Sequence, residues 1–305
     1  MFCRRVRFRG TERGQVMVLT AVGMVAICAV AGFSVDVASW YQTQRKTQAV
    51  ADAAALAAVK NLPGNQSQAS SDASTFASKN SGTLATTAFS TKYMSGDTIT
   101  VTASATAPAY FLKVIGINSA NVTASSTATA ENLQSANGAM PFGVINTQSQ
   151  LSGAGCPCYN TPTTLTISKV GAPGGFGIVN VDGSSGPASP GTLANWITNG
   201  CNCTTNSPQW YPGTPGARFN SSQVQSAMNG VIGKTELFPV YDQVTGSGAN
   251  ITFHVIGWSA FTITGWSGRG SSATITGYWV KADWVGKGTT SPSNYFGVTT
   301  SVLTG

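Results

Sequence analysis

The sequence predicts an α+β protein with a long N-terminal helix that begins in a membrane, a small α+β unit, and a mostly antiparallel β domain at the C-terminal end. Three observations carry this prediction. Residues 14–35 contain no charged side chain, residues 49–58 are dominated by alanine, and six of the seven tryptophans follow residue 139. A membrane-length apolar run, the strongest helix former and short aromatic runs bounded by turn residues favour these three elements.

The charge-free run of 22 residues, 14–35, predicts a transmembrane helix. At about 1.5 Å per residue it spans about 33 Å, enough to cross a hydrocarbon core of about 30 Å. Five arginines precede it: Arg4, Arg5, Arg7, Arg9 and Arg13. Because basic residues stay on the cytoplasmic side, we expect residues 1–13 to be a cytoplasmic tail, residues 14–35 to span the inner membrane, and the rest to be extracytoplasmic.

A cleaved signal peptide is the alternative to this anchor. The residues Ala29-Val30-Ala31 before Gly32 resemble a cleavage site. However, the apolar run is longer than the roughly 7–15 residues of a signal peptide's apolar region. No helix breaker separates it from the segment that follows. We therefore favour a retained signal-anchor.

Helix is predicted to continue beyond the membrane. Residues 36–60 contain neither proline nor glycine, and Pro63 and Gly64 then supply a stop signal, so we expect an alanine-rich extracytoplasmic helix over residues 36–62. Residues 63–138 predict a small α+β unit with a short helix near 71–79, loop over the rest of 64–97, and a strand pair after residue 97.

Several strings in this N-terminal region occur together in one known family. They are Glu12-Arg13-Gly14-Gln15, Gly32-Phe33-Ser34-Val35-Asp36-Val37, Trp40-Tyr41, Arg45-Lys46 and the segment 48–58. The combination resembles the TadE/TadG-like domain of Flp (tight adherence) pilus-assembly proteins. Residues 98–103, 108–117 and 122–128 are similar to the strand, turn and strand that often follow the anchor in these proteins. Gly14, Asp36 and Asp52 are the family-motif positions that carry over.

The resemblance implies a single-pass, pseudopilin-like accessory protein of pilus assembly that acts through protein contacts. Its implied partners are the lipid bilayer and other pilus-assembly or pilin-like envelope proteins. Gly10 is followed by Glu12 at the second position instead of the fifth, so processing by a prepilin peptidase is not expected. The string 182–186 lacks the second serine of a von Willebrand A metal site, so adhesion through such a metal is not expected either.

The charge of the chain argues against nucleic acid as a partner. The formal net charge is +7, but five of the 17 basic side chains and one of the 10 acidic ones lie in residues 1–13. Residues 14–305 thus carry 12 basic and 9 acidic side chains, which is no nucleic-acid footprint.

Residues 139–305 predict a β domain with its own core, and both a sandwich and a barrel are open. Turn residues separate the expected strands. The strands are predicted over 165–167, 176–181, 237–241, 251–258, 261–266 and 273–280, and helices over 192–198 and 221–232. Core packing is the favoured role for most tryptophans, and strand alternation places Tyr278 and Trp279 on opposite faces.

Four cysteines of this domain form two C-x-C pairs, Cys156 with Cys158 and Cys201 with Cys203. Disulfides persist outside the cytoplasm, and a bridge within either pair would close a very small ring. We therefore expect two bridges that run between the pairs. A four-thiolate metal site is the alternative, although its usual spacing is C-x₂₋₄-C.

The sequence contains no evident constellation for catalysis, and no cofactor is expected. His254 is the one histidine of the chain, and it lies in an apolar strand where a hydrogen-bonded sheet residue is the favoured interpretation. Two other classes remain as rivals. One is a surface adhesin or glycan-binding module whose exposed tryptophans stack on sugars, and the other is an envelope hydrolase that depends on Asp242 or His254.

Overall fold

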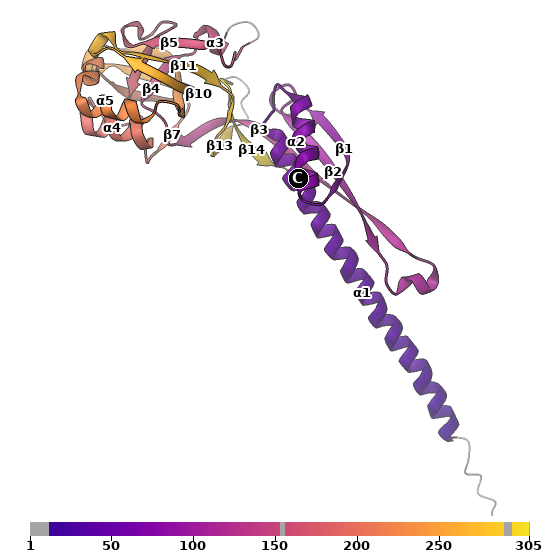
Figure 1. The fold of residues 1–305 in the computed structure, drawn as a ribbon. Helices are drawn as coiled ribbons and strands as arrows, with labels where there is room; N and C mark the ends of the chain where they lie inside the picture. The colour runs from indigo at the N-terminus through magenta and orange to yellow at the C-terminus, as the bar shows by residue number, and fades with distance from the viewer. Residues whose placement is uncertain (1–11, 153–155, 290–294, 305) are drawn as a thin grey trace, which may run out of the picture.

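The computed structural model describes residues 12–152, 156–289 and 295–304. Its longest element is helix α1 (Glu12–Val59), which forms a stem with the β domain at its far end (Figure 1). In the described part of the chain, α1 is the single helix long and apolar enough to cross a membrane. The predicted α+β class and the order of its three parts are confirmed.

The two halves of α1 lie in different surroundings. Val16, Val25 and other apolar side chains of its first half are exposed on every side, whereas Val50 to Val59 are mostly buried. A helix that is apolar all round needs an apolar surrounding, and a bilayer provides it. The single helix expected from the membrane run into the alanine-rich run is confirmed.

The alanine-rich half of α1 packs on a small α+β unit. Helix α2 (Gln66–Lys79) lies beside it, together with an antiparallel sheet of β1 (Thr83–Ser90), β2 (Thr98–Pro108) and β3 (Ser119–Asn137). Small alanine side chains let helix and sheet approach closely, and Ile99 and Val101 fill the contact. Strand β1 lies where a loop was predicted, so that prediction is wrong. The segment has many threonines and few apolar residues, and so shows no clear strand pattern in the sequence.

Strand β3 also belongs to the C-terminal part of the chain. Its second half pairs with β14 (Val298–Leu303), β13 (Gly286–Thr289) and β7 (Thr204–Asn206), and β12 (Ala282–Asp283) pairs with β14. The chain end thus returns to the sheet that packs on α1, which links the two parts by main-chain hydrogen bonds.

The β domain is a closed ring of strands, which decides between the sandwich and the barrel. Hydrogen bonds connect β10 to β8, β8 to β6, β6 to β4, β4 to β9, and β9 back to β10. These strands are β4 (Phe142–Ile145), β6 (Phe176–Val179), β8 (Gln209–Thr214), β9 (Thr235–Thr245) and β10 (Thr252–Ser267). All of these pairings are antiparallel except β4 with β9.

Further strands and helices complete the barrel. Strand β11 (Thr274–Val280) pairs with β10, and β5 (Pro162–Thr166) pairs with β11. The helices are α3 (Ser149–Ser152), α4 (Pro190–Asn199) and α5 (Ser222–Gly230), and the 3-10 turns are η1 (Leu112–Ile115), η2 (Ile167–Lys169), η3 (Gly216–Asn220), η4 (Gly248–Asn250) and η5 (Gly270–Ser272). Two strands expected over 251–258 and 261–266 are one strand, β10, because its residues between them stay paired with β9.

Aromatic rings fill the barrel. Phe238 lies at the centre of this cluster, with ring centroids 5.9 Å from Phe142, 5.3 Å from Phe261 and 6.1 Å from Trp279. Trp196, Trp258 and Trp279 are buried, which confirms core packing for these tryptophans. Trp279 is buried while its neighbour Tyr278 is half-buried, as the alternation predicted.

Replacing Phe238 by alanine should lower the free energy of unfolding of the barrel by about 3–5 kcal/mol, because the change leaves a cavity among rings that cannot close it. Denaturant unfolding of the full chain in detergent, followed by tryptophan fluorescence, measures this loss. Phe76→Ala is the matched control, since Phe76 is 40% exposed on α2. Equal losses for the two variants would contradict the assigned core.

Candidate functional site

One polar constellation outside the barrel joins Asp36 of α1 to the tip of the β2–β3 hairpin. The Asp36 carboxylate is buried and accepts the main-chain N–H groups of Tyr110 at 2.6 Å, Phe111 at 3.0 Å and Leu112 at 2.7 Å. A buried carboxylate is costly unless it is hydrogen-bonded, and hydrogen bonds with an ionised acceptor are the stronger kind. This contact, here called the Asp36 clasp, holds the hairpin tip against α1.

Gly32 lies one helical turn before Asp36 and gives the tip room. A Cβ at this position would lie 2.8 Å from ring atoms of Phe111. Because real Cβ atoms do not approach so closely, the ring can pack on α1 only where the helix has no side chain.

Two more side chains of α1 continue the contact along the hairpin. Gln44 donates to the carbonyl of Thr123 at 3.1 Å, and Gln48 donates to that of Ser125 at 3.2 Å. Gln48 also donates to the Asp52 carboxylate at 2.7 Å. Of the three predicted family-motif positions, Asp36 thus bonds to the hairpin directly, and Asp52 bonds to Gln48, which in turn bonds to the hairpin.

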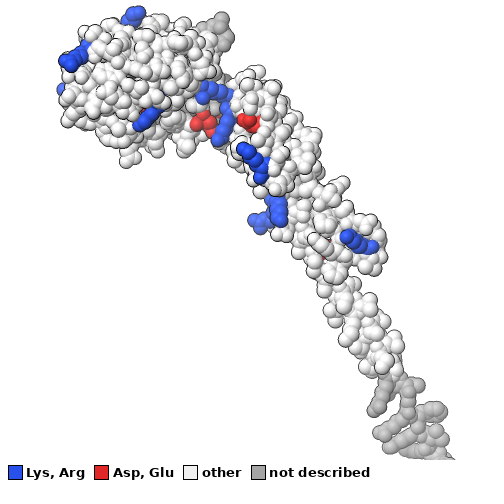
Figure 2. All heavy atoms as spheres, in the orientation of Figure 1, with Lys and Arg blue, Asp and Glu red and all other residues white. Residues whose placement is uncertain are grey.

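The remaining residues singled out at this end have other positions. Gly14 is exposed, and a Cβ there would have no neighbour within 4 Å. Arg4, Arg5, Arg7 and Arg9 lie outside the described residues, as does the side chain of Arg13. Figure 2 shows the N-terminal part of the stem free of charged side chains, in accord with the sequence of residues 14–35.

Helix α1 is similar to a segment of a known protein family. Residues 14–61 match the family described as putative Flp pilus-assembly TadE/G-like. The TadE/G-like segment, as we call residues 14–61, covers all but the first two residues of α1 and ends just after it. The resemblance predicted from the motifs is thus confirmed for residues 14–61. Neither the curated proteins nor the solved structures compared with the chain gave a match.

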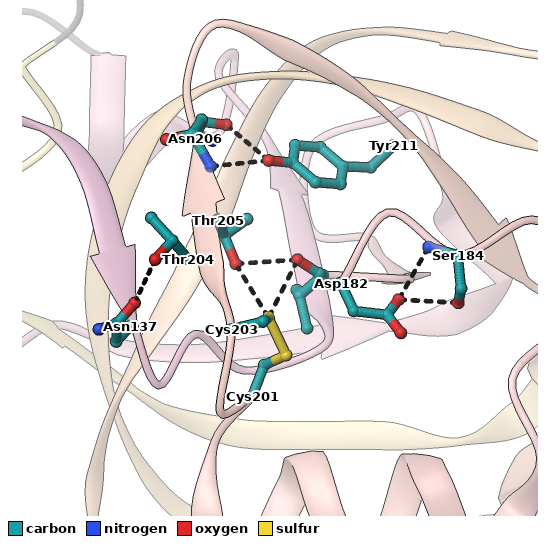
Figure 3. Close-up of a disulfide and its surroundings, with 10 residues drawn as sticks. Asn137, Asp182, Ser184, Cys201, Cys203, Thr204, Thr205, Asn206 and Tyr211 are labelled. Atoms are coloured by element: carbon teal, nitrogen blue, oxygen red, sulfur yellow. Dashed lines mark hydrogen bonds between the residues drawn. A yellow bond between two sulfur atoms is a disulfide. The ribbon is translucent and has the colours of Figure 1, made fainter.

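The cysteines pair differently from the prediction. One disulfide joins Cys156 to Cys158, and a second joins Cys201 to Cys203 (Figure 3 shows the second). The predicted bridges between the pairs are therefore wrong. The Cα atoms lie 4.4 Å apart in the first pair and 5.1 Å apart in the second, within the range that a disulfide spans.

The two cysteine pairs lie in different parts of the structure, which explains the correction. Cys158 donates its N–H to Gln150 in α3. Cys201 exchanges main-chain hydrogen bonds with Gly138 and Ala139, at the end of β3. A disulfide within a C-x-C pair was not expected because it closes a very small ring. The chain turns sharply enough at each pair to close that ring.

The structure brings together His254 and Asp242, a pair that no sequence pattern predicts. Nδ1 of His254 lies 2.7 Å from Oδ1 of Asp242, and the Trp210 ring lies 5.0 Å from the imidazole. A shift in the β9–β10 register beside His254 brings the carboxylate alongside. This bulge is invisible to strand alternation, and it explains why sequence reasoning missed the pair.

Among the described residues, no further group completes a catalytic or metal site beside this pair. In the described part of the chain, no hydroxyl group forms a hydrogen bond with His254, whose partner is Asp242. Nor do the described residues contain a group of three or more His, Cys, Asp or Glu side chains that could hold a metal ion. Asp182, in the string examined for a metal site, instead accepts hydrogen bonds from Ser184 in its own turn (Figure 3).

A cavity of about 550 Å³ opens at one end of the barrel. Strands β6 and β10 contribute Ile178 and Phe253 to its wall, and Arg269 is the one charged residue among the described residues that line it. The described residues that line this cavity include no carboxylate, and so do not provide the acid and base of a paired-carboxylate hydrolase.

Asp97 closes the turn between β1 and β2. Burial acts to raise the pKa of this carboxyl, but the main-chain N–H groups of Met94, Lys92 and Tyr93 and the hydroxyl of Thr98 outweigh burial and lower the pKa. The ionised form is thus the one that the fold stabilises.

The small unit should lose stability in acid because of Asp97. A lowered pKa in the folded state contributes stability that is present above the usual carboxyl pKa, about 3.9, and lost as the pH falls through the folded-state value. Hydrogen exchange of the turn amides across this range measures the loss. In Asp97→Asn the protection of these amides, measured relative to their intrinsic exchange rates, should no longer depend on pH across this range, and persistence of that dependence would contradict the assignment.

Replacing Asp36 by asparagine should release the hairpin tip, because the charge is lost and an amide NH₂ group then faces main-chain donors. The amides of residues 110–112 should exchange faster with solvent in full-length protein, while those of β10 stay protected. Asp182→Asn is the matched control, since Asp182 accepts hydrogen bonds within its own turn. Unchanged protection of residues 110–112 would contradict the clasp.

Proposed function

We propose that this chain is a single-pass, membrane-anchored accessory protein of Flp pilus assembly that acts through protein contacts. The observation that carries the proposal is the match of residues 14–61 to the TadE/G-like family, on a helix whose first half exposes apolar side chains on every side. The family points to a structural role, and the site described above is a packing contact between elements instead of a reaction centre.

Topology forms part of the proposal. By the positive-inside rule, the arginines before the apolar run support a cytoplasmic N-terminus and a barrel outside the inner membrane. In this arrangement the stem lies in the lipid beside pilin-like helices or an assembly platform. The barrel stands away from the membrane, where it meets other envelope components. The two disulfides fit an oxidising compartment.

A second candidate function is glycan binding by the barrel. The observation that favours it is Trp210, whose side chain is 44% exposed next to His254 and Asp242. An exposed indole beside hydrogen-bonding side chains is an arrangement that can stack on a sugar ring.

One complementation experiment separates the two functions. In a host that makes Flp pili and carries this gene, deletion should reduce pilus number and surface attachment, and the wild-type gene should restore both. Trp210→Ala should restore both as well, and Trp266→Ala, a half-buried tryptophan of the same barrel, is its matched control.

Unchanged pili after deletion would contradict the role in assembly. Normal pilus number with attachment lost in the Trp210→Ala strain alone would favour the glycan-binding candidate. Normal attachment in that strain, together with pili lost on deletion, supports assembly by protein contact.

A further inference from the structure

The tip of the β2–β3 hairpin carries apolar side chains that nothing in the described chain covers. Val114 is 90% exposed and Ile115 is 70% exposed, and Tyr110 and Phe111 are each more than half exposed. On the arms of the hairpin, the exposed positions are mostly polar, such as Thr106, Asn121 and Thr123. Within the hairpin, the exposed large apolar side chains are thus confined to the tip. An exposed apolar patch of this kind marks an interaction surface.

The position of the tip along α1 indicates which environment surrounds its exposed apolar side chains. The hairpin runs back along α1 toward the apolar stem, and its tip is the part of the sheet nearest to that stem (Figure 1). Phe111 packs over Gly32, and Asp36 holds residues 110–112. The tip therefore lies at the level where the charge-free run of α1 ends.

The length of the free stem agrees with this placement. From Gly14 to Gly32 the helix rises about 27 Å, close to the hydrocarbon thickness of about 30 Å. When this part of α1 spans the membrane, the hydrocarbon ends at the hairpin tip. The side chains of the tip suit that depth, because aromatic rings concentrate at the membrane–water interface. Lys113, on the same turn, suits anionic headgroups.

We propose that residues 110–117 insert into the interfacial layer of the bilayer beside α1, on the side of the membrane that holds the barrel. The protein then contacts the membrane twice, through the stem and through the hairpin tip. Two contacts joined by the Asp36 clasp fix the depth of the stem and limit its tilt. This inference depends on α1 as a membrane anchor and not on a role in pilus assembly.

Fluorescence quenching of the full chain in lipid nanodiscs tests the proposal. The discs contain phosphatidylethanolamine and phosphatidylglycerol, and Cys3 and Cys28 are replaced by serine. An environment-sensitive dye is attached to Val114→Cys in one variant and to Val285→Cys in the other. Val285 is the matched control, because it is a valine 92% exposed between β12 and β13, outside the hairpin. Both side chains are free of packing, so neither change disturbs the fold.

The dye at position 114 should be quenched by lipids with a spin label near the headgroup, and its quenching by aqueous iodide should be several-fold weaker than at position 285. Equal iodide quenching at the two positions would overturn the proposal, because the tip would then lie in water. Protection from iodide without quenching by spin-labelled lipid would also overturn it, since protein, such as a second copy of this chain, would then cover the tip.

Discussion

The structure depends on one contact, the Asp36 clasp. Asp36 is the first charged residue after the apolar run of α1. A carboxylate buried there needs hydrogen-bond donors, and its own helix offers none because helical N–H groups are already paired. The donors come from main chain 74 to 76 residues later. Meeting this local requirement therefore sets a long-range constraint, which lays the β2–β3 hairpin along the helix.

Strand β3 carries this constraint to the far end of the molecule. Its first half pairs with β2 beside α1, and its second half pairs with strands from the C-terminal part of the chain. Side chains reinforce the junction, since Lys281 donates to the Pro63 carbonyl and Trp284 donates to that of Asn137, both at 3.3 Å. A continuous strand resists bending better than a flexible linker does. The barrel is thus held at a defined position relative to the membrane anchor.

Local structure in this chain can be predicted from the sequence, whereas contacts between residues far apart in the chain cannot. The helix of residues 14–61 and the hairpin after residue 97 follow from periodicity and composition, and both are confirmed. Asp36 was identified as a family-motif position, but its donors lie too far along the chain to be inferred. The Asp242–His254 pair depends on a register shift, and the disulfides depend on how sharply the chain turns at each C-x-C. Neither property is encoded in spacing alone.

Cross-linking of the membrane-embedded chain tests the central claim most directly. A Cβ at position 32 would lie 2.9 Å from Cβ of Phe111, so cysteines at these two positions need only a small shift to form a disulfide. With Cys3 and Cys28 replaced by serine, Gly32→Cys with Phe111→Cys should oxidise within single chains, as shown by mass mapping of the joined peptides. A control pair at positions 32 and 114 should not. Bonds formed only between chains, or none at all, would contradict the clasp between stem and hairpin.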